Sequence, residues 1–334
     1  MTRKILTSIL FLSLFPVLLL AQAPVTAQKP SEGEKAGPKW ALAIHGGAGT
    51  IPKNLPEAEK EQYLRSLTEA LKVGQGVLQQ GGTSLDAVEK VVRFLEADPL
   101  FNAGKGAVYT HEGTHELDAA IMDGRTLACG SVAALKTVKS PIGLARLVME
   151  KSPHVFMVGE GAEKFAAEMK VETVPNSWFD TPKRYQQLQE ALKKEKEEKD
   201  KDTVGAVALD THGNLAAATS TGGMTNKRFG RLGDVPVIGA GTYANNRTCA
   251  ISATGYGEEF IKHTVAHDIS ALVEYGGLTL QQAADRVIHQ KLKPDDGGVI
   301  GVGRDGSIAL VFNSEGMYRG AADSNGRFEV KIWE

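Results

Sequence analysis

The stretch Asp202-Thr203-Val204-Gly205-Ala206-Val207-Ala208-Leu209-Asp210 marks an abrupt change of character in the chain. A dense charged run, residues 193–201, precedes it, and an apolar segment typical of a buried strand follows Thr203. Cleavage of the backbone before Thr203 would place a hydroxyl and a free α-amine on one residue. An α-amine has a pKa of about 8, so it can accept the proton of its own hydroxyl near neutral pH. On spacing alone, Thr203 is either such a nucleophile or an ordinary β-forming residue at a strand start.

The composition is that of a globular protein with one large domain or two small ones. The chain has 334 residues, 37 of them glycine, and a formal net charge of -2. This charge gives no argument for nucleic-acid binding. Cys129 and Cys249 lie in apolar surroundings without metal or redox spacing, and we interpret both as buried thiols.

The first residues have the pattern of an export signal. Arg3 and Lys4 precede an apolar run, residues 5–20, and the small residues after it predict cleavage following Ala27. An uncleaved membrane anchor is the alternative, although the run is short for a membrane span. We therefore expect a signal peptide over residues 1–27, a polar linker over 28–39, and a periplasmic or secreted protein without membrane attachment after signal removal.

The rest of the chain, residues 40–334, predicts a single α+β domain. Helices are expected over residues 56–80, after Thr83, and over 142–151, 161–169 and 258–275; Thr279 with Gln282 predicts a capping box for another. Residues 186–202 are either a charged helix or an exposed linker. Strands are expected over 40–44, 120–122, 131–135, 203–209, 215–221, 235–241, 249–252, 299–302 and 308–311. Because βαβ alternation is absent from this pattern, two packed antiparallel sheets covered by helices fit best.

Besides Thr203, three groups of residues could carry chemistry. Thr221 ends a strand beside glycines and could orient Thr203, or be an ordinary strand end. Arg231 and Asp234 could bind the carboxylate and ammonium of an amino acid, or form a solvated surface pair. Thr254 and Gly255 precede a helix and could stabilise an oxyanion, or form a plain turn.

Two histidines, His263 and His267, stand four residues apart without the His-Glu-x-x-His pattern. We interpret them as surface histidines rather than metal ligands. The His45-Gly-Gly-Ala-Gly segment is expected to be a strand-to-loop turn, and it lacks the Gly-Lys-Ser/Thr of a phosphate loop.

Seven segments, taken in order, resemble the plant-type asparaginase/isoaspartyl peptidase family from about residue 40 to the C-terminus. They are His45-Gly-Gly-Ala-Gly, Asn102-Ala-Gly-x-Gly, Glu116-Leu-Asp-Ala, Thr203-Val-Gly-Ala-Val-Ala-Leu-Asp, Thr219-Ser-Thr-Gly-Gly-Met-Thr-Asn-Lys, Gly230-Arg-x-Gly-Asp and Gly239-Ala-Gly-x-Tyr-Ala. Each segment alone is weakly specific, but seven in register are highly specific.

The resemblance implies an N-terminal-nucleophile hydrolase with a four-layer αββα sandwich. It implies self-cleavage between Asp202 and Thr203, giving chains 28–202 and 203–334 that stay together, and a dimer of such two-chain units. By motif match, Thr203 is the nucleophile, Thr221 its neighbour, Arg231 and Asp234 the substrate clamp, and Thr254 and Gly255 the oxyanion and substrate-binding positions.

The same resemblance implies no cofactor for catalysis and a structural sodium ion. The ion would be held by backbone carbonyls in the loop around Asn102, namely those of Leu95, Glu96, Asp98, Phe101, Ala103 and Lys105. Two positions depart from the family pattern. Asp202 stands where many members have glycine, although related glycosylasparaginases have aspartate there, and Tyr256 stands where a smaller or more polar residue is usual.

The implied reaction releases L-aspartate from β-aspartyl dipeptides and L-asparagine through a β-aspartyl ester on Thr203. Two other interpretations remain open. A glycosylasparaginase would use the same fold and nucleophile on glycosylated asparagine, and a non-maturing exported binding protein would bind amino acids without turnover.

Overall fold

The computed structural model describes residues 40–194 and 202–334. The predicted signal peptide, residues 1–27, and the polar linker, 28–39, lie outside the described residues, as do residues 195–201 of the charged segment. In the two ranges described, no helix has both the length and the apolarity that a membrane crossing requires.

Strands of the described residues form an eight-stranded and a four-stranded sheet. The strand orders are β12-β11-β1-β5-β6-β2-β3-β4 and β10-β9-β8-β7. Neighbouring strands pair antiparallel, except that β3 and β4 are parallel. The strand bounds are β1 Ala41–Gly49, β2 Leu117–Asp123, β3 Cys129–Leu135, β4 Phe156–Val158, β5 Val204–Leu209, β6 Leu215–Thr221, β7 Thr242–Ala244, β8 Cys249–Gly255, β9 Gly297–Gly303, β10 Ile308–Phe312, β11 Gly316–Asp323 and β12 Phe328–Lys331.

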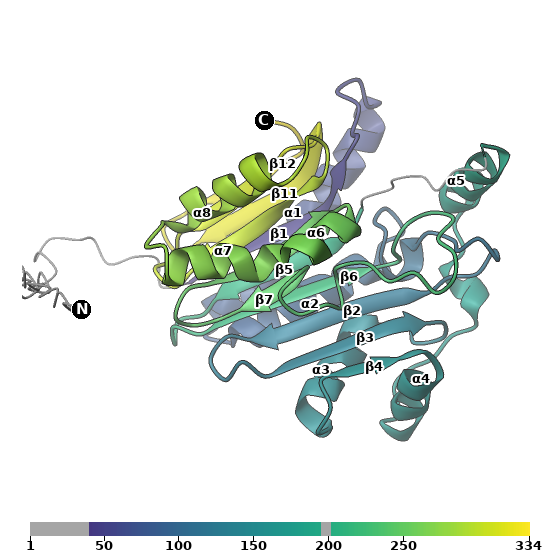
Figure 1. Ribbon diagram of the computed structural model, residues 1–334, viewed down its shortest axis with the longest axis horizontal. Coiled ribbons are helices and arrows are strands. Elements are labelled where there is room, and N and C mark those ends of the chain that lie inside the picture. The colour runs from purple at the N-terminus through teal and green to yellow at the C-terminus, as the bar shows by residue number, and fades with distance from the viewer. Residues whose placement is uncertain (1–39, 195–201) are drawn as a thin grey trace, which may run out of the picture. The chain divides into compact units, whose positions relative to one another are not determined.

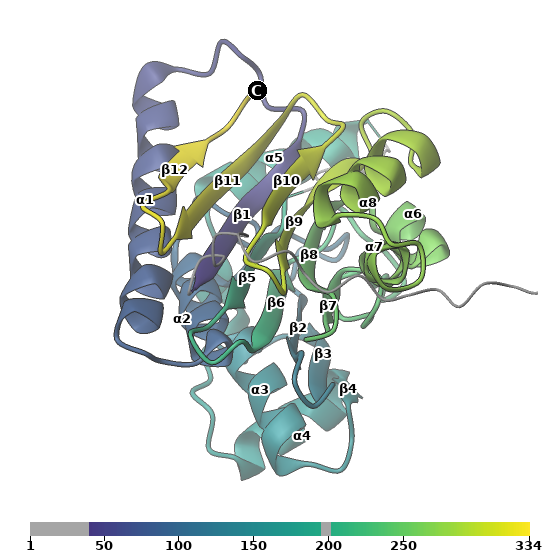
Figure 2. The ribbon, with the colours of Figure 1, turned by 90° about the vertical axis from the view of Figure 1, so that its left-hand side faces the viewer.

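Helices cover the outer faces of both sheets, as Figures 1 and 2 show. Helices α1, α2 and α3 lie on the larger sheet, and α6, α7 and α8 lie on the smaller one. The helix bounds are α1 Glu57–Gln79, α2 Ser84–Ala97, α3 Pro141–Lys151, α4 Gly159–Glu168, α5 Pro182–Lys193, α6 Gly257–His263, α7 Val265–Glu274 and α8 Leu280–Arg286. Short helical turns are η1 Gly104–Gly106, η2 Asn176–Phe179 and η3 Val287–Lys291. The predicted α+β, four-layer αββα sandwich is confirmed.

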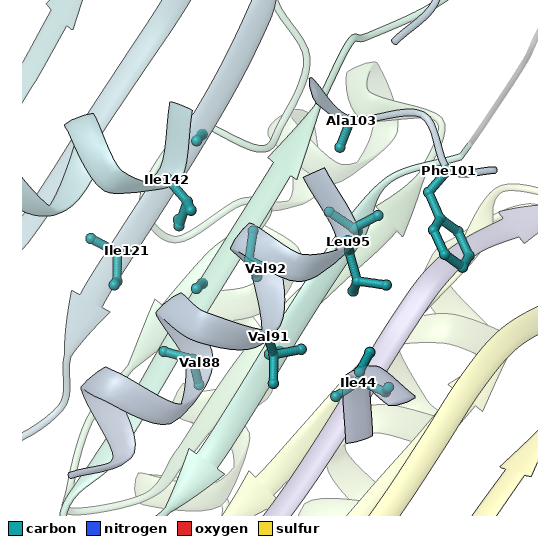
Figure 3. Close-up of a cluster of buried hydrophobic side chains, with 14 of the residues drawn as sticks. Ile44, Val88, Val91, Val92, Leu95, Phe101, Ala103, Ile121 and Ile142 are labelled. Carbon is teal, nitrogen blue, oxygen red and sulfur yellow. The ribbon is translucent and has the colours of Figure 1, made fainter. Parts of the chain in front are cut away.

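Three buried clusters fill the three spaces between the four layers. Side chains of β1 alternate between its two faces. Leu42 and Ile44 belong to the cluster under α1 and α2, whereas Ala41 and Ala43 belong to the cluster between the sheets. A third cluster lies between the smaller sheet and its helices and includes Ile251 and Ile269. Figure 3 shows the first cluster, with Val88, Val91, Val92 and Leu95 of α2 beside Ile44 of β1 and Ile121 of β2.

Local sequence signals gave several elements correctly. The hairpin β5–β6 and the hairpin β9–β10 form as predicted. Thr279 caps α8, because its Oγ1 accepts from the Gln282 amide N at 3.3 Å while Gln282 Oε1 accepts from the Thr279 N at 3.1 Å. The predicted capping box is therefore confirmed.

The predicted strand over residues 235–241 is wrong, because this segment forms nested turns. Pro236 has no N–H to donate to a ladder. The amides of Val237 and Gly241 both donate to the carbonyl of Asp234, at 3.0 and 3.1 Å. These turns fix the backbone at Asp234, and the strand begins only at Thr242.

The predicted single helix over residues 258–275 is also wrong, because it breaks at Thr264. Thr264 has a left-handed conformation with φ of 45°, which is unfavourable for a β-branched residue. The amides of Ala266 and His267 donate instead to the carbonyls of Ala240 and Gly239, at 3.1 and 2.8 Å. Tertiary hydrogen bonds thus satisfy the start of α7 and separate His263 from His267.

Two further differences concern elements near the middle of the chain. The His45-Gly-Gly-Ala-Gly segment is not a turn: β1 continues to Gly49, with a register shift between His45 and Gly47 where Gly47 has φ of 120°. Helix α5 begins at Pro182, capped by Thr181, so the charged segment starts inside a helix. Strands β4, β11 and β12 were missed by sequence reasoning.

Candidate active site

The hairpin β5–β6 places Thr203 opposite Thr221. Val204 pairs with Ser220. Thr203, which comes just before Val204, therefore faces Thr221, which comes just after Ser220. Thr203 Oγ1 donates a hydrogen bond to Thr221 Oγ1 at 3.3 Å, and both residues are buried. Thr221 Oγ1 also accepts from the Gly223 amide at 3.0 Å, which fixes its position. The predicted nucleophile and its predicted neighbour are therefore in direct contact.

The carbonyl oxygen of Asp202, at the predicted cleavage site, accepts two hydrogen bonds. Asn102 Nδ2 donates at 2.9 Å, and Thr221 Oγ1 donates at 3.4 Å. Asn102 is itself oriented, because its Oδ1 accepts from the Val108 amide at 3.0 Å. Such donors would stabilise negative charge on this oxygen. Sequence reasoning assigned Asn102 only to the sodium loop, although its position in a glycine-rich segment of the resemblance was a usable signal.

A chain of hydroxyls leads to Thr203 through His45. The Thr203 carbonyl can only accept, so His45 Nδ1 donates to it at 3.0 Å and Nε2 accepts from Ser252 Oγ at 2.8 Å. Burial lowers the pKa of His45 to about 3, which keeps the ring neutral. Ser252 Oγ lies 2.8 Å from Thr219 Oγ1, which accepts from Thr242 Oγ1 at 2.7 Å. These uncharged groups tie both sheets to the nucleophile.

Gly205 explains how the sheets approach each other at this point. A Cβ added there would collide with Ser252 Oγ and His45 Nε2. Only glycine therefore permits the hydrogen bond between β1 and β8 directly behind Thr203.

The predicted clamp residues Arg231 and Asp234 converge beside Gly257. A Cβ added at Gly257 would lie 2.9 Å from Arg231 Nη2 and 2.9 Å from Asp234 Oδ1. Glu258 fixes the guanidinium, because Nε and Nη2 of Arg231 donate to its two carboxylate oxygens at 3.0 and 2.9 Å. Arg231 Nη1 lies outside that fork. Glu258 was missed by sequence reasoning, since only the folded chain brings it to Arg231.

Asp234 has a carboxylate oxygen that lacks a hydrogen-bond partner among the described residues. Its Oδ2 is buried, and the residue is 5% exposed. Burial raises the pKa of Asp234 to about 7, and the nearby positive charge of Arg231 only partly opposes that effect. An arriving ammonium group would satisfy Oδ2 and restore the ionised carboxylate.

Thr254 and Gly255 end β8, and Thr254 lies on the same face of the strand as Ser252. Thr254 is buried, and its Oγ1 accepts from the Ala48 amide of β1 at 3.1 Å. A Cβ at Gly255 would collide with the Asp296 carbonyl. The structure thus joins Thr254 to the glycine segment of β1.

The six residues of the predicted sodium loop run from the last turn of α2, which contains Leu95 and Glu96, to η1, which contains Lys105. A Cβ at Gly104 would collide with the Glu96 carbonyl oxygen, and one at Gly106 with the Phe101 carbonyl oxygen. These two glycines therefore let the Glu96 and Phe101 carbonyls approach the backbone closely. Neutral oxygen donors suit a hard cation, so the donor set fits sodium.

His263 and His267 belong to different helices and are not paired with each other. Within residues 40–194 and 202–334, no cluster of three or more histidine, cysteine, aspartate or glutamate side chains could hold a metal ion.

Known proteins resemble this chain over most of its length. A family model described as asparaginase matches residues 38–332. The isoaspartyl peptidase of Salmonella typhimurium is 53% identical over 295 residues, covering 84% of this chain and 94% of that protein. The isoaspartyl peptidase of Escherichia coli is 51% identical over 295 residues, which cover 84% of this chain and 92% of that protein. A probable isoaspartyl peptidase/L-asparaginase 2 of Arabidopsis thaliana is 44% identical over 324 residues, which cover 88% of this chain and 99% of that protein.

The matched range and the αββα sandwich define an N-terminal-nucleophile hydrolase. The chain belongs to the asparaginase family. It is an enzyme of the hydrolase class, and catalysis in this family needs no cofactor.

Proposed function

We propose that this protein is a self-processing amidohydrolase that releases L-aspartate from β-aspartyl dipeptides and L-asparagine. The observation that carries the proposal is the contact between Thr203 Oγ1 and Thr221 Oγ1 next to an Asp202 carbonyl held by Asn102. The names of the relatives, isoaspartyl peptidase and isoaspartyl peptidase/L-asparaginase, support the substrate class.

Maturation begins when Thr203 Oγ attacks the Asp202 carbonyl carbon. The C–N bond to Thr203 breaks, the proton of the attacking hydroxyl ends on the departing nitrogen, which becomes the α-amine, and an ester joins Asp202 to the Thr203 oxygen. Water then hydrolyses that ester, leaving chains 28–202 and 203–334. The Asn102 amide is positioned to stabilise the oxyanion of the attack.

In the mature enzyme, the free α-amine of Thr203 acts as base for its own hydroxyl. Arg231 binds the substrate α-carboxylate and Asp234 binds the α-ammonium, which presents the β-carbonyl to Thr203 Oγ. Thr254 and Gly255 hold the oxyanion. Ammonia or a peptide amine leaves, and water hydrolyses the β-aspartyl ester on Thr203 to free L-aspartate.

Side-by-side assays test the specificity. Purified protein is incubated with L-asparagine, a β-aspartyl dipeptide and a glycosylated asparagine, and released L-aspartate is measured. Turnover of the first two substrates is expected. Preference for the glycosylated substrate would identify a glycosylasparaginase, and binding without turnover by an uncut chain would identify a binding protein.

Three further features of the mature protein are proposed. A structural sodium ion would bind the backbone carbonyls of the predicted sodium loop around Asn102. Two cleaved units would form a dimer. Residues 1–27 would be removed during export. Sedimentation would measure the dimer. N-terminal sequencing of the exported form tests removal of the signal peptide. A start at residue 20 or earlier, within the apolar run, would refute it.

A further inference from the structure

Arg184 is a buried cation beside the predicted cleavage site. It lies in α5, is 1% exposed, and its amide donates to the capping Thr181 Oγ1 at 3.3 Å. Its Nε donates to the Gly106 carbonyl at 2.8 Å, and its Nη1 donates to Gln187 Oε1 at 3.0 Å. These bonds fix the guanidinium plane. A fully buried arginine is costly unless a carboxylate pairs with it.

A carboxylate that faces Arg184 belongs to Asp202, the residue before the proposed cleavage site. Arg184 Nη2 lies 3.6 Å from Asp202 Oδ2. Both residues line a cavity of about 190 Å³ together with Tyr63, Tyr318 and Lys183. The ion pair therefore joins helix α5 to the residue before the predicted cleavage site.

Two other elements hold Asp202 at its backbone. Asn102 Nδ2 donates to its carbonyl oxygen at 2.9 Å. On β1, a Cβ added at Gly47 would lie 2.9 Å from the Asp202 Cα and 2.7 Å from its Oδ1, so the chain passes tightly against the β1 bulge. The Asp202 side chain is a further point of attachment, and a glycine at this position would lack it.

We propose that Arg184 is a positioning residue for self-cleavage, which it promotes by holding the Asp202 carboxylate so that the Asp202 carbonyl carbon faces Thr203 Oγ1. This proposal rests on the proposed self-processing. Arg184 does not touch the reacting atoms. It restricts the residue whose carbonyl is attacked, and orientation of reacting groups is a large source of rate acceleration.

A double-mutant cycle tests the coupling between the two side chains. Wild type, Arg184→Gln, Asp202→Asn and the double variant are made by cell-free synthesis of the full chain, and conversion to two chains is timed on denaturing gels with mass spectrometry. Each single variant is expected to slow cleavage by about tenfold or more, because loosened orientation of a reacting group slows its reaction. The double variant is expected to be no slower than the slower single variant.

Lys183→Gln is the matched control. Lys183 lines the same cavity from the same helix, but its Nζ pairs with Glu59 Oε1 at 3.0 Å. This variant is expected to cleave at the wild-type rate, and the cleaved Arg184→Gln enzyme is expected to keep the wild-type kcat/KM.

Four outcomes would overturn the inference: a wild-type rate in Arg184→Gln or Asp202→Asn, additive effects in the double variant, or equal slowing by Lys183→Gln. If Arg184→Gln fails to fold, as judged by the melting temperature of its uncut Thr203→Ala form, Asp202→Asn decides alone. A wild type that never cleaves would refute the proposed self-processing, whereas a cleaving wild type without coupling would refute only the role of Arg184.

Discussion

The surroundings of Thr203 and of Asp234 differ in how completely their polar groups are paired. Behind Thr203, neutral groups from His45 to Thr242 form a continuous chain of hydrogen bonds. At the clamp, Arg231 is paired with Glu258, but Asp234 Oδ2 is buried without a partner in the part of the chain described. On the proposed mechanism, Thr203 is thus positioned before any substrate arrives, whereas a substrate would complete the clamp. Changes near Thr203 should affect maturation, and changes near Asp234 should affect substrate binding.

Replacing Asn102 with alanine should have the largest effect on the nucleophile side. The Asp202 carbonyl loses its 2.9 Å donor, and loss of one oxyanion donor typically slows a reaction by about 10²–10³-fold. Self-cleavage timed by mass spectrometry measures this. Asn313→Ala is the control, because Asn313 also bridges loops through its amide, at 2.8 and 2.9 Å, away from the cleavage site. Equal slowing in both variants would contradict a specific role for Asn102.

Replacing Arg231 with alanine should separate the two regions. We expect KM for L-asparagine to rise by about 10²-fold, the usual scale for losing a charged partner at a binding site, while self-cleavage persists. Arg228→Ala, in the same loop, should leave KM within about twofold, because mutations outside key contacts have small effects. Steady-state kinetics on the cleaved enzymes gives both values. An unchanged KM in Arg231→Ala would remove Arg231 from the clamp.

The pH dependence of kcat/KM should report the ionisation of Asp234. Its pKa is raised to about 7 by burial, and binding an ammonium requires the carboxylate, so Asp234 should add a second fall in kcat/KM below about pH 7 to the fall that the α-amine sets below about 8. The limiting slope for one proton is about tenfold per pH unit. In Asp234→Asn this limb should vanish, leaving the limb of the α-amine near a pKa of about 8. Persistence of the limb near 7 in that variant would assign it to another group.

Replacing Thr242 with valine should have the smallest effect. The substitution removes the hydroxyl that donates to Thr219 Oγ1 at 2.7 Å, at the far end of the chain behind Thr203. The expected loss is about 1 kcal/mol in the free energy of unfolding, the usual net value of one hydrogen bond. Urea unfolding of the uncut Thr203→Ala form measures it, with Thr242→Ser as the control that keeps the hydroxyl. A KM change without a stability change would mean that Thr242 belongs to the clamp instead.

The sequence predicted those parts of the site that depend on local pattern. The contact between Thr203 and Thr221 follows from a short hairpin whose alternation and turn are visible in the residues themselves. The contact of Asn102 with Asp202 joins residues 100 positions apart, and local periodicity carries no information about it. The clamp needed both kinds of information. Arg231 and Asp234 were proposed from a motif, but Glu258 reaches Arg231 only after α6 has folded.

The errors of the fold prediction have the same origin. Residues 235–241 are apolar enough for a strand, but Pro236 and the two bonds to the Asp234 carbonyl make turns. Residues 258–275 have a continuous helical pattern, but the carbonyls of Gly239 and Ala240 start a new helix after Thr264. In both places, tertiary hydrogen bonds outweigh local preference, and in the first they position a clamp residue.

The central claim is that Thr203 becomes an N-terminal nucleophile by self-cleavage. The most direct measurement is a denaturing gel with mass spectrometry of purified wild type beside Thr203→Ala. Two chains in the wild type, one of them beginning at Thr203, and a single intact chain in the variant are the predicted result. A wild type that stays a single chain through extended incubation would contradict the claim.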